Sequence, residues 1–599
     1  MRLAAAPMAT GGNQLSMSAL DWMIVLLANG AIILAGVLRS RDTRTSADWF
    51  LAGRTLPWWM IGLSLYATVI DSGDLVADAG GTYAVGMSYM LTNWVGVTAG
   101  WYLLAHRFAV PMYRRGMYTN AEYLEARFGL ATRIASALVQ ALYRTLVLGI
   151  VATTLYLVLA IVGNLGSSAW WCVGAIAACA AVYTSMGGLK SVALTDALQS
   201  GLMVAGSVAL FVAAWAAAGG WDGAAGRLDA HQEGLSKQLL HVGSDNVARQ
   251  STDGDSLQQV ERRLLLGGTH DPAADEIVST NPAWLVALAW IIMGLSYATV
   301  NHTQSMRILG ARTEWDMKMS VVLAGVVLIV LTFTNLTVGI MGRALYPDPI
   351  LMPLDTALQV RDSTFPLLVR ELTSTGVRGL VVAGIVASAF STLDSIGSTV
   401  PSLLVRDIYA RLLVTDRDDA YYVRASRMMT PLVILGSFGF VPLLLQEKGM
   451  LLVLLDWVGA FVVPLLAVHL MGEFTRAHRS SAAIGLTVGI VYGTLKLLAP
   501  AVALRFGIAL LPAALVNEFA SPVFSLALTA GVMVAVTAIR GTEASSRPRD
   551  LEPLGWLRSS QLAALALHVA TERRGTAFPA LLGAAVVVLG TVLGFVVFW

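Results

Sequence analysis

Charged residues are scarce in this chain of 599 residues: Asp, Glu, Lys and Arg together make up 13% of it, about half the share in a soluble domain. Hydrophobic residues make up 56% and come in long runs without the alternation of β-strands. Each run is long enough to cross a bilayer of about 30 Å. The sequence therefore predicts an all-α polytopic membrane protein. Examples of such runs are Ala19–Leu38, Leu202–Ala218, Val321–Ile340 and Phe578–Phe598.

Cysteine is nearly absent, and so are the signatures of enzymes. Cys172 and Cys179 are the two cysteines; seven helical residues place them about 10 Å apart, too far for a disulfide, so we interpret them as packing residues. There is no HExxH, no P-loop and no nucleophile elbow in context, which argues against an enzyme. The N-terminus lacks the pattern of a cleaved signal peptide, and we expect the first span to be retained.

Fourteen membrane spans are predicted from the apolar runs. Basic residues gather in alternate loops: Arg39 and Arg44 follow the first span, Arg307 and Arg312 the seventh, and Arg406 the ninth. The positive-inside rule puts these loops in the cytoplasm, so both termini are expected outside the plasma (inner) membrane. The predicted spans are 19–38, 57–83, 86–110, 130–163, 168–186, 191–219, 284–309, 318–344, 377–404, 428–446, 449–472, 481–502, 519–539 and 578–598.

Two of the expected outer loops are long. Residues 220–282 are polar and residues 346–377 are amphipathic. Solvated excursions are the first interpretation of both loops, and a lid over an outer vestibule is the second.

Two spans carry polar interruptions at matching places. The second span is interrupted by Asp71-Ser72-Gly73-Asp74, and the seventh contains Ser296, Tyr297, Thr299 and Asn301. Interrupted helices are costly in a bilayer, because each freed backbone group needs a partner. The two spans lie five apart, and a repeated five-span unit must be inverted in the membrane. Secondary transporters are commonly built from such repeats, with their binding sites at the breaks.

Four stretches resemble the sodium:solute symporters, the family of the sodium/glucose, sodium/proline and sodium/sialic acid transporters, and the overall pattern is most similar to the sugar branch. The resemblance covers roughly residues 45–500. The stretches are DWFLAGRTLPWW before the broken span, GMYTNAEYLEARFG at 116–129, TSMGGLKSVALTDALQSG at 184–201, and FPLLVRELTSTGVRGLVVAGIVASAFSTLDSIGSTVPSLLVRDIY at 365–409.

The resemblance implies a LeuT-like inverted five-helix repeat, with one helix before it and three after, and sodium-coupled uptake by alternating access. The expected organisation is as follows: residues 1–44, an N-terminal tail and the first helix; 45–219, the first repeat half; 220–283, an extracellular loop; 284–475, the second half; and 476–599, three C-terminal helices with a cytoplasmic basic loop at 540–577.

A seam of hydroxyls runs along the helix expected at 377–404. Sodium is a hard cation that prefers oxygen ligands, and hydroxyls supply oxygens without charge. The resemblance implies a sodium site formed by the carbonyls of Ala67, Ile70 and Ser388 and the hydroxyls of Ser391 and Thr392. Some relatives use the aspartate at Asp196, with hydroxyls such as Ser395, for a second sodium ion. A structural or gating role for Asp196 is the other interpretation.

The solute pocket is expected between the broken spans and the third and eleventh spans. Sugar-transporting relatives carry a lysine in the eighth span and a glutamine in the eleventh, and the corresponding stretches of this chain, SVVLAGVVLIVLTF and MLLVLLDWVGAF, contain neither. Acids stand out instead, and they would accept hydroxyls of a polyol, pair with an amine or carry a proton. Asp71 and Asp74 have a second interpretation as caps of the break, and His302 as a structural residue. The candidates are Asp71, Asp74, Asp78, Asn93, Trp94, Tyr297, Asn301, His302 and Asp456, and Asp394 flanks the sodium seam.

The sequence thus predicts a sodium-coupled symporter that imports a small polar organic solute such as a sugar or polyol, with sodium as its ion. It is expected to work as a monomer in the bilayer, without nucleic acid. The alternatives are a proton-coupled or amino-acid/amine symporter of the same fold, a solute sensor without transport, and a channel. A channel would not need a cage that replaces the whole hydration shell of sodium.

Overall fold

A computed structural model describes residues 17–599 except 41–42, 253–254, 273, 348–359, 446–449, 546–547, 551–552, 554 and 568–574. Most of the expected N-terminal tail, residues 1–16, therefore lies outside the described residues. The same holds for the middle of the amphipathic 346–377 segment and for parts of the expected basic loop 540–577.

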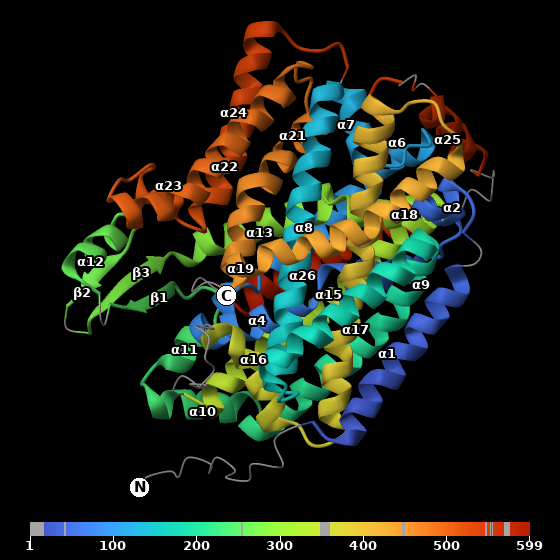
Figure 1. The fold of residues 1–599 in the computed structure, drawn as a ribbon. Helices are drawn as coiled ribbons and strands as arrows, with labels where there is room; N and C mark the ends of the chain where they lie inside the picture. Colours follow the sequence, from blue (N-terminus) through green and yellow to red (C-terminus); the bar gives the residue numbers. More distant parts are fainter. Residues whose placement is uncertain are drawn as a thin grey trace.

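The protein is predominantly helical, as its apolar runs predict (Figure 1). In the described part of the chain, eleven helices are long and apolar enough to cross a membrane, or twelve if the bent pair α3/α4 is one span. The predicted count of fourteen stays a prediction. The helices of the N-terminal part of the chain are α1 Ala19–Ser40, α2 Ser46–Leu51, α3 Trp58–Val69, α4 Ser72–Val85, α5 Asn93–Leu103, α6 Ala109–Arg114, α7 Asn120–Phe128, α8 Leu130–Ile161 and α9 Ala169–Ala218.

The second part of the chain repeats this helical character. Its helices are α13 Ala283–Val300, α14 His302–Leu309, α15 Glu314–Leu345, α16 Val360–Leu372, α17 Val377–Ser402, α18 Asp419–Gly436, α19 Val441–Leu444, α20 Met450–Trp457, α21 Val463–Phe474, α22 Ser481–Phe506, α23 Ala513–Val516, α24 Ala520–Arg540, α25 Gly555–Ala566 and α26 Ala577–Val592.

One predicted boundary is confirmed and another is wrong. The spans expected at 168–186 and 191–219 both lie in α9, and a break at Gly188, whose φ of 57° and ψ of −165° are non-helical, separates them as predicted. The helix expected from residue 428 begins at Asp419, because the Asp418 side chain accepts a hydrogen bond from the Tyr421 backbone N–H at 3.2 Å and caps it. The first turn of α18 is polar and capped by Asp418, so the apolar run that predicted this span does not include it.

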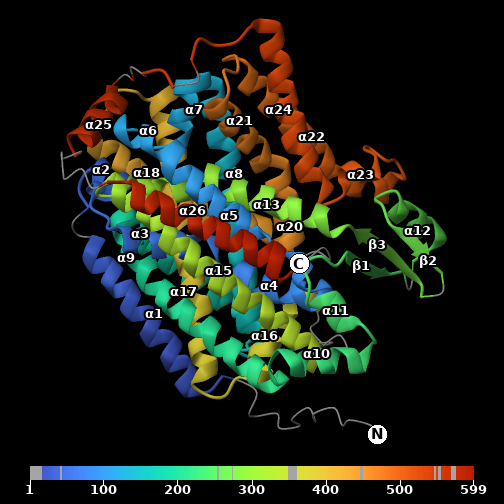
Figure 2. The ribbon, with the colours of Figure 1, turned by 180° about the vertical axis from the view of Figure 1, so that it is seen from behind.

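Helix α17 forms the centre of the bundle, and nearly all of its residues are buried. It packs closely on α9: a Cβ added at Gly384 would lie 3.0 Å from the Leu202 carbonyl oxygen, so glycine favours this approach. Helices α1 and α24 lie at the periphery, and α26 packs against α5 and α15 (Figure 2). The hydroxyl seam of α17 is therefore in the interior rather than facing lipid.

The loop after α9 is folded, which the sequence did not predict. It contains α10 Gly220–His231, α11 Leu235–Leu239, α12 Leu257–Leu264 and an antiparallel sheet in the order β1-β3-β2 (Figure 1). The strands are β1 Asn246–Ser251, β2 Thr269–Asp271 and β3 Glu276–Asn281, with Asn246 opposite Asn281. Arg262 of α12 donates to the Leu504 carbonyl of α22 at 3.0 Å, so the loop packs against the C-terminal helices.

A cluster of ion pairs joins α7, α8 and the π-helical end of α17 on the side expected to face the cytoplasm. The buried Arg133 guanidinium lies 2.6 Å from both the Glu125 and the Asp407 carboxylates. Helix α25 docks beside this cluster, since Tyr118 donates to the Ser560 carbonyl at 2.9 Å. A charged network thus ties together segments that are far apart in the sequence.

Candidate functional site

The second span is broken, as its sequence predicts. Helices α3 and α4 meet at 55°, and Ile70 and Asp71 between them are extended. The Asp71 carboxylate accepts the backbone N–H groups of Gly73 (2.7 Å) and Asp74 (3.1 Å), and the Asp74 carboxylate accepts that of Asp71 (2.9 Å). This is a capping box. The two acids therefore stabilise the break by starting α4, as the second interpretation expected.

The end of α3 leaves backbone carbonyls without helical partners, and hydroxyls of α17 lie against them. The Ser391 hydroxyl donates to the Ala67 carbonyl at 3.0 Å, and the Ser388 hydroxyl donates to the Ile70 carbonyl at 3.3 Å. The Thr392 hydroxyl donates to the Ser388 carbonyl at 3.2 Å. The structure thus brings together all five residues of the expected sodium site.

These five oxygen donors suit a small hard cation. All three α17 side chains are fully buried, and a hydroxyl can turn its hydrogen away and present a lone pair. The three hydrogen-bonded pairs of oxygens are each 3.0–3.3 Å apart. The chemistry of this donor set fits sodium, which prefers uncharged and charged oxygens over nitrogen or sulfur.

A buried ion pair lies directly beside these oxygens. Asp196 of α9 accepts a hydrogen bond from the Ser391 hydroxyl at 2.6 Å, and its other oxygen lies 2.8 Å from the Arg307 guanidinium of α14. Both charged side chains are fully buried. Arg307 also donates to Ser64 at 2.7 Å and to Ser395. The structure thus brings Asp196 and Ser395 together, with a guanidinium between them.

Arg307 belongs to the site, although the sequence analysis placed it among the basic residues of a cytoplasmic loop. Its side chain is fully buried and ties α14 to α3, α9 and α17. The available signal was an arginine inside the predicted span 284–309, close to its polar interruption, but Arg307 was counted with the basic residues after the span. The seventh span does break as expected, at Asn301, which is extended (φ −70°, ψ 115°) between α13 and α14.

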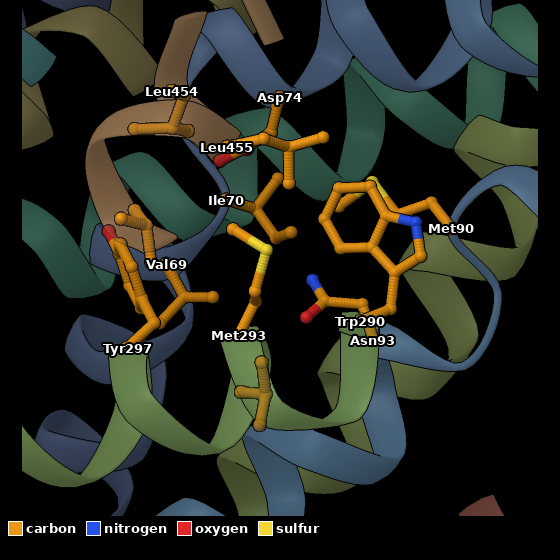
Figure 3. Close-up of a pocket in the computed structure, with 12 residues that line it drawn as sticks. Val69, Ile70, Asp74, Met90, Asn93, Trp290, Met293, Tyr297, Leu454 and Leu455 are labelled. Carbon is orange, nitrogen blue, oxygen red and sulfur yellow. The ribbon is translucent and has the colours of Figure 1, made fainter. Parts of the chain in front are cut away.

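A cavity of about 50 Å³ lies at the α3/α4 break (Figure 3). Three of the predicted solute residues line it: Asp74 from α4, Asn93 from α5 and Tyr297 from α13. Tyr297 also accepts a hydrogen bond from Arg144 at 2.9 Å and donates to the Thr68 carbonyl at 3.3 Å. The cavity therefore lies between both broken spans and the third and eleventh, as expected.

The other candidates lie elsewhere. Asp71 lines a smaller neighbouring cavity of about 10 Å³. Trp94 donates to the Gly590 carbonyl of α26 at 3.0 Å, Asp456 pairs with Lys496 of α22, and Asn301 caps α14. His302 is buried beside Ser402, at 3.4 Å.

Asp394 is also turned away from the cavity, because it accepts hydrogen bonds from Tyr183 at 2.6 Å and Thr195 at 3.1 Å. Asp78 is fully buried, and neither of its carboxylate oxygens has a hydrogen-bond partner among the described residues.

Several site residues were missed by sequence reasoning. Trp290, Met293 and Leu454 line the cavity, and nothing distinguishes them from other apolar residues of their spans. Arg144 of α8 did carry a signal, since a charge within an apolar run is a functional hypothesis by default.

Comparison with known proteins gives one consistent result. The sodium:solute symporter family matches residues 49–489. Solute carrier family 5 member 4 of Rattus norvegicus is 27% identical over 80% of this chain and 70% of its own length. Sodium/myo-inositol cotransporter 2 of the same species is 27% identical (81% and 71%), and sodium/glucose cotransporter 1 of Oryctolagus cuniculus is 26% identical (80% and 72%).

A solved structure agrees on the fold. The substrate-bound, outward-open form of a sodium-coupled sialic acid symporter superposes with a TM-score of 0.67 over 88% of this chain and 99% of that one, at 20% identity. With the family match across most of the chain, this confirms the predicted resemblance: the chain belongs to the sodium:solute symporter family.

Proposed function

We propose that this protein imports a small polar organic solute by alternating access, with sodium bound by Ala67, Ile70, Ser388, Ser391 and Thr392. Its relatives are sodium-coupled transporters rather than enzymes. We further propose that residues 45–219 and 284–475 are the two inverted halves, in a monomer of the plasma membrane with both termini outside.

One observation carries the sodium site. Hydroxyls of α17 and the carbonyls freed at the end of α3 come within 3.0–3.3 Å of each other, although more than 300 residues separate them in the chain. The C-terminal end of α3 also carries negative partial charge. Sodium would bind carbonyl oxygens of α3 and hydroxyl oxygens of α17 at the same time. Its binding therefore favours the conformation in which the α3/α4 break contacts the hydroxyl seam of α17.

Asp196 and Ser395 have a structural role in this proposal. The Arg307 guanidinium already supplies a positive charge between them. We therefore propose that this pair positions Ser391, whose hydroxyl contacts Asp196, rather than holding a second ion.

One sodium ion provides enough energy for accumulation. Moving one charge through about 100 mV supplies ~2.3 kcal/mol, and a tenfold sodium gradient adds ~1.4 kcal/mol. Together these sustain a solute gradient of a few hundredfold.

The experiment is sodium titration of Ser391→Ala and Thr392→Ala, measured by thermal unfolding of purified protein in sodium against potassium. Because binding to the folded state raises stability, each variant should need more sodium for the same shift. Ser398→Ala is the matched control, since that buried hydroxyl bonds only to its own helix, at the Ser395 carbonyl. An unchanged sodium dependence in both variants would refute the site.

A further inference from the structure

The lining of the cavity at the α3/α4 break is mostly apolar (Figure 3). Its polar lining is one carboxylate, one amide and one phenol, from Asp74, Asn93 and Tyr297. The other nine lining residues are apolar or aromatic, among them Trp290 and Met293. Such a lining suits a solute with one strongly polar group on an apolar body.

The broken helix carries a cluster of three acids. Asp71, Asp74 and Asp78 all lie on its α4 side, and no other described residue forms an ion pair with them. Arg144 acts on Asp71 and Asp74 through space. Its hydrogen bonds go to the hydroxyls of Tyr143 and Tyr297.

The cluster offers a place for one more cation. Asp196 does not compete for that cation, because it pairs with Arg307. A buried carboxylate in a membrane is costly unless a proton or a cation neutralises it, and a cationic solute at Asp74 would supply that positive charge.

The N-terminus of α4 is not open to an anionic group. In broken-helix transporters, the N-terminus of the second half-helix commonly receives a solute carboxylate. Here the first N–H groups of α4 already bind the Asp71 carboxylate, at 2.7 and 3.1 Å. The chain's own acid therefore occupies that position, which disfavours carboxylate and amino-acid solutes.

A polyol also fits poorly. Each buried hydroxyl without a partner costs roughly 1–3 kcal/mol, and a sugar would bring more hydroxyls than the three polar side chains can satisfy. An ammonium group would instead form a charge-assisted hydrogen bond with Asp74. The indole of Trp290 would add a favourable cation–π contact, and the thioethers would cover the apolar body.

Building on the proposed symport, we propose that the co-transported solute is an organic monocation: a protonated amine on a small apolar body, with its ammonium on Asp74. The α4 carboxylate cluster, Asp71, Asp74 and Asp78, then sets selectivity for positive charge. This reverses the expectation of a sugar or polyol that the relatives suggest.

The first test is thermal unfolding of the full-length protein in sodium, with matched pairs of probes. Butylamine, phenethylamine and cyclohexylamine are compared with 1-butanol, 2-phenylethanol and cyclohexanol, and with glucose and myo-inositol. At least one amine should stabilise the protein when sodium is present, and its alcohol should not. If sodium stabilises but no amine adds to it, or if myo-inositol adds instead, the monocation inference is wrong and the symporter stands. If sodium has no effect, the proposed function fails as well.

Asp74→Asn isolates the charge. Asparagine keeps an oxygen to accept the Asp71 N–H, so the capping box can persist while the carboxylate is lost. The amine affinity should fall by about tenfold or more, with the sodium response retained. Asp48→Asn is the matched control, because Asp48 holds the same capping-box position in α2, far from the cavity. Equal amine affinity in both variants would overturn the assignment to Asp74.

Charge counting in proteoliposomes gives an independent readout. With one sodium per solute, a monocation moves two charges per molecule taken up, whereas a neutral solute moves one. The solute in this experiment is the amine identified by thermal unfolding. Current and tracer uptake are measured on the same vesicles, and their ratio gives the number of charges moved per solute molecule. A ratio of one would overturn the inference.

Discussion

Breaking the Arg307–Asp196 pair is the most informative perturbation of this protein. The two side chains lie 2.8 Å apart with no exposed surface, and Arg307 also holds Ser64 and Ser395. Arg307→Met keeps most of the side-chain volume but leaves the Asp196 carboxylate buried without its cation. Removing one partner of a buried pair costs roughly 3–5 kcal/mol, a large part of a total stability that is about 5–15 kcal/mol.

A double-mutant cycle distinguishes the pair from simple packing. Asp196→Asn alone leaves the guanidinium unpaired and should also be costly. The double variant Asp196→Asn/Arg307→Met removes both charges. Its loss of unfolding free energy should therefore be smaller than the sum of the losses in the two single variants, by about 2 kcal/mol or more.

The assay is unfolding of purified protein in detergent, followed in sodium and in potassium. The ion pair holds Ser391 through Asp196, so the single variants should also lose part of the sodium-dependent stabilisation. Additive costs within about 0.5 kcal/mol would refute the reasoning, because they would mean that the two charges do not depend on each other.

Two further perturbations test the scaffold. Gly188→Ala should prevent folding, because a Cβ there would lie 2.7 Å from Trp49 atoms and the positive φ disfavours any side chain. The yield of folded protein is the measurement. Gly174→Ala is the control, because the space around Gly174 is open. Arg133→Met should lower stability by about 3–5 kcal/mol, since it strands buried carboxylates including Asp407; a variant as stable as the parent would contradict the role of this cluster.

Much of the architecture could be predicted because its signals are local. Apolar runs long enough to span a bilayer locate the helices, and polar interruptions locate the breaks at Asp71 and Asn301. The sheet after α9 escaped prediction, because its short strands lie in a polar segment without alternation. The start of α18 was missed for a similar reason, since its capped first turn is polar.

The roles of single polar residues could not be predicted, because their partners come from distant parts of the chain. Asp456 is a candidate from sequence, yet Lys496 of another helix binds it. Trp94 points to α26 rather than to the cavity. Arg307 sits at the end of an interrupted span, and only the packing of α3, α9 and α17 around it places it inside the bundle.

In the proposed mechanism, the break in α3/α4 would connect the ion to the solute through two adjacent residues. The Ile70 carbonyl faces the Ser388 hydroxyl, and Ile70 also lines the cavity. The next residue, Asp71, caps the helix that presents Asp74 to the solute. Sodium at Ile70 would therefore fix the backbone that positions Asp74, and a solute on Asp74 would fix the carbonyl that binds sodium. Because such coupling is reciprocal, Asp74→Asn should remove the increase in sodium affinity that the solute produces, while sodium binding alone persists. Sodium titrations with and without the solute measure this, and an equal increase in the variant and the parent would show that the break does not couple the two sites.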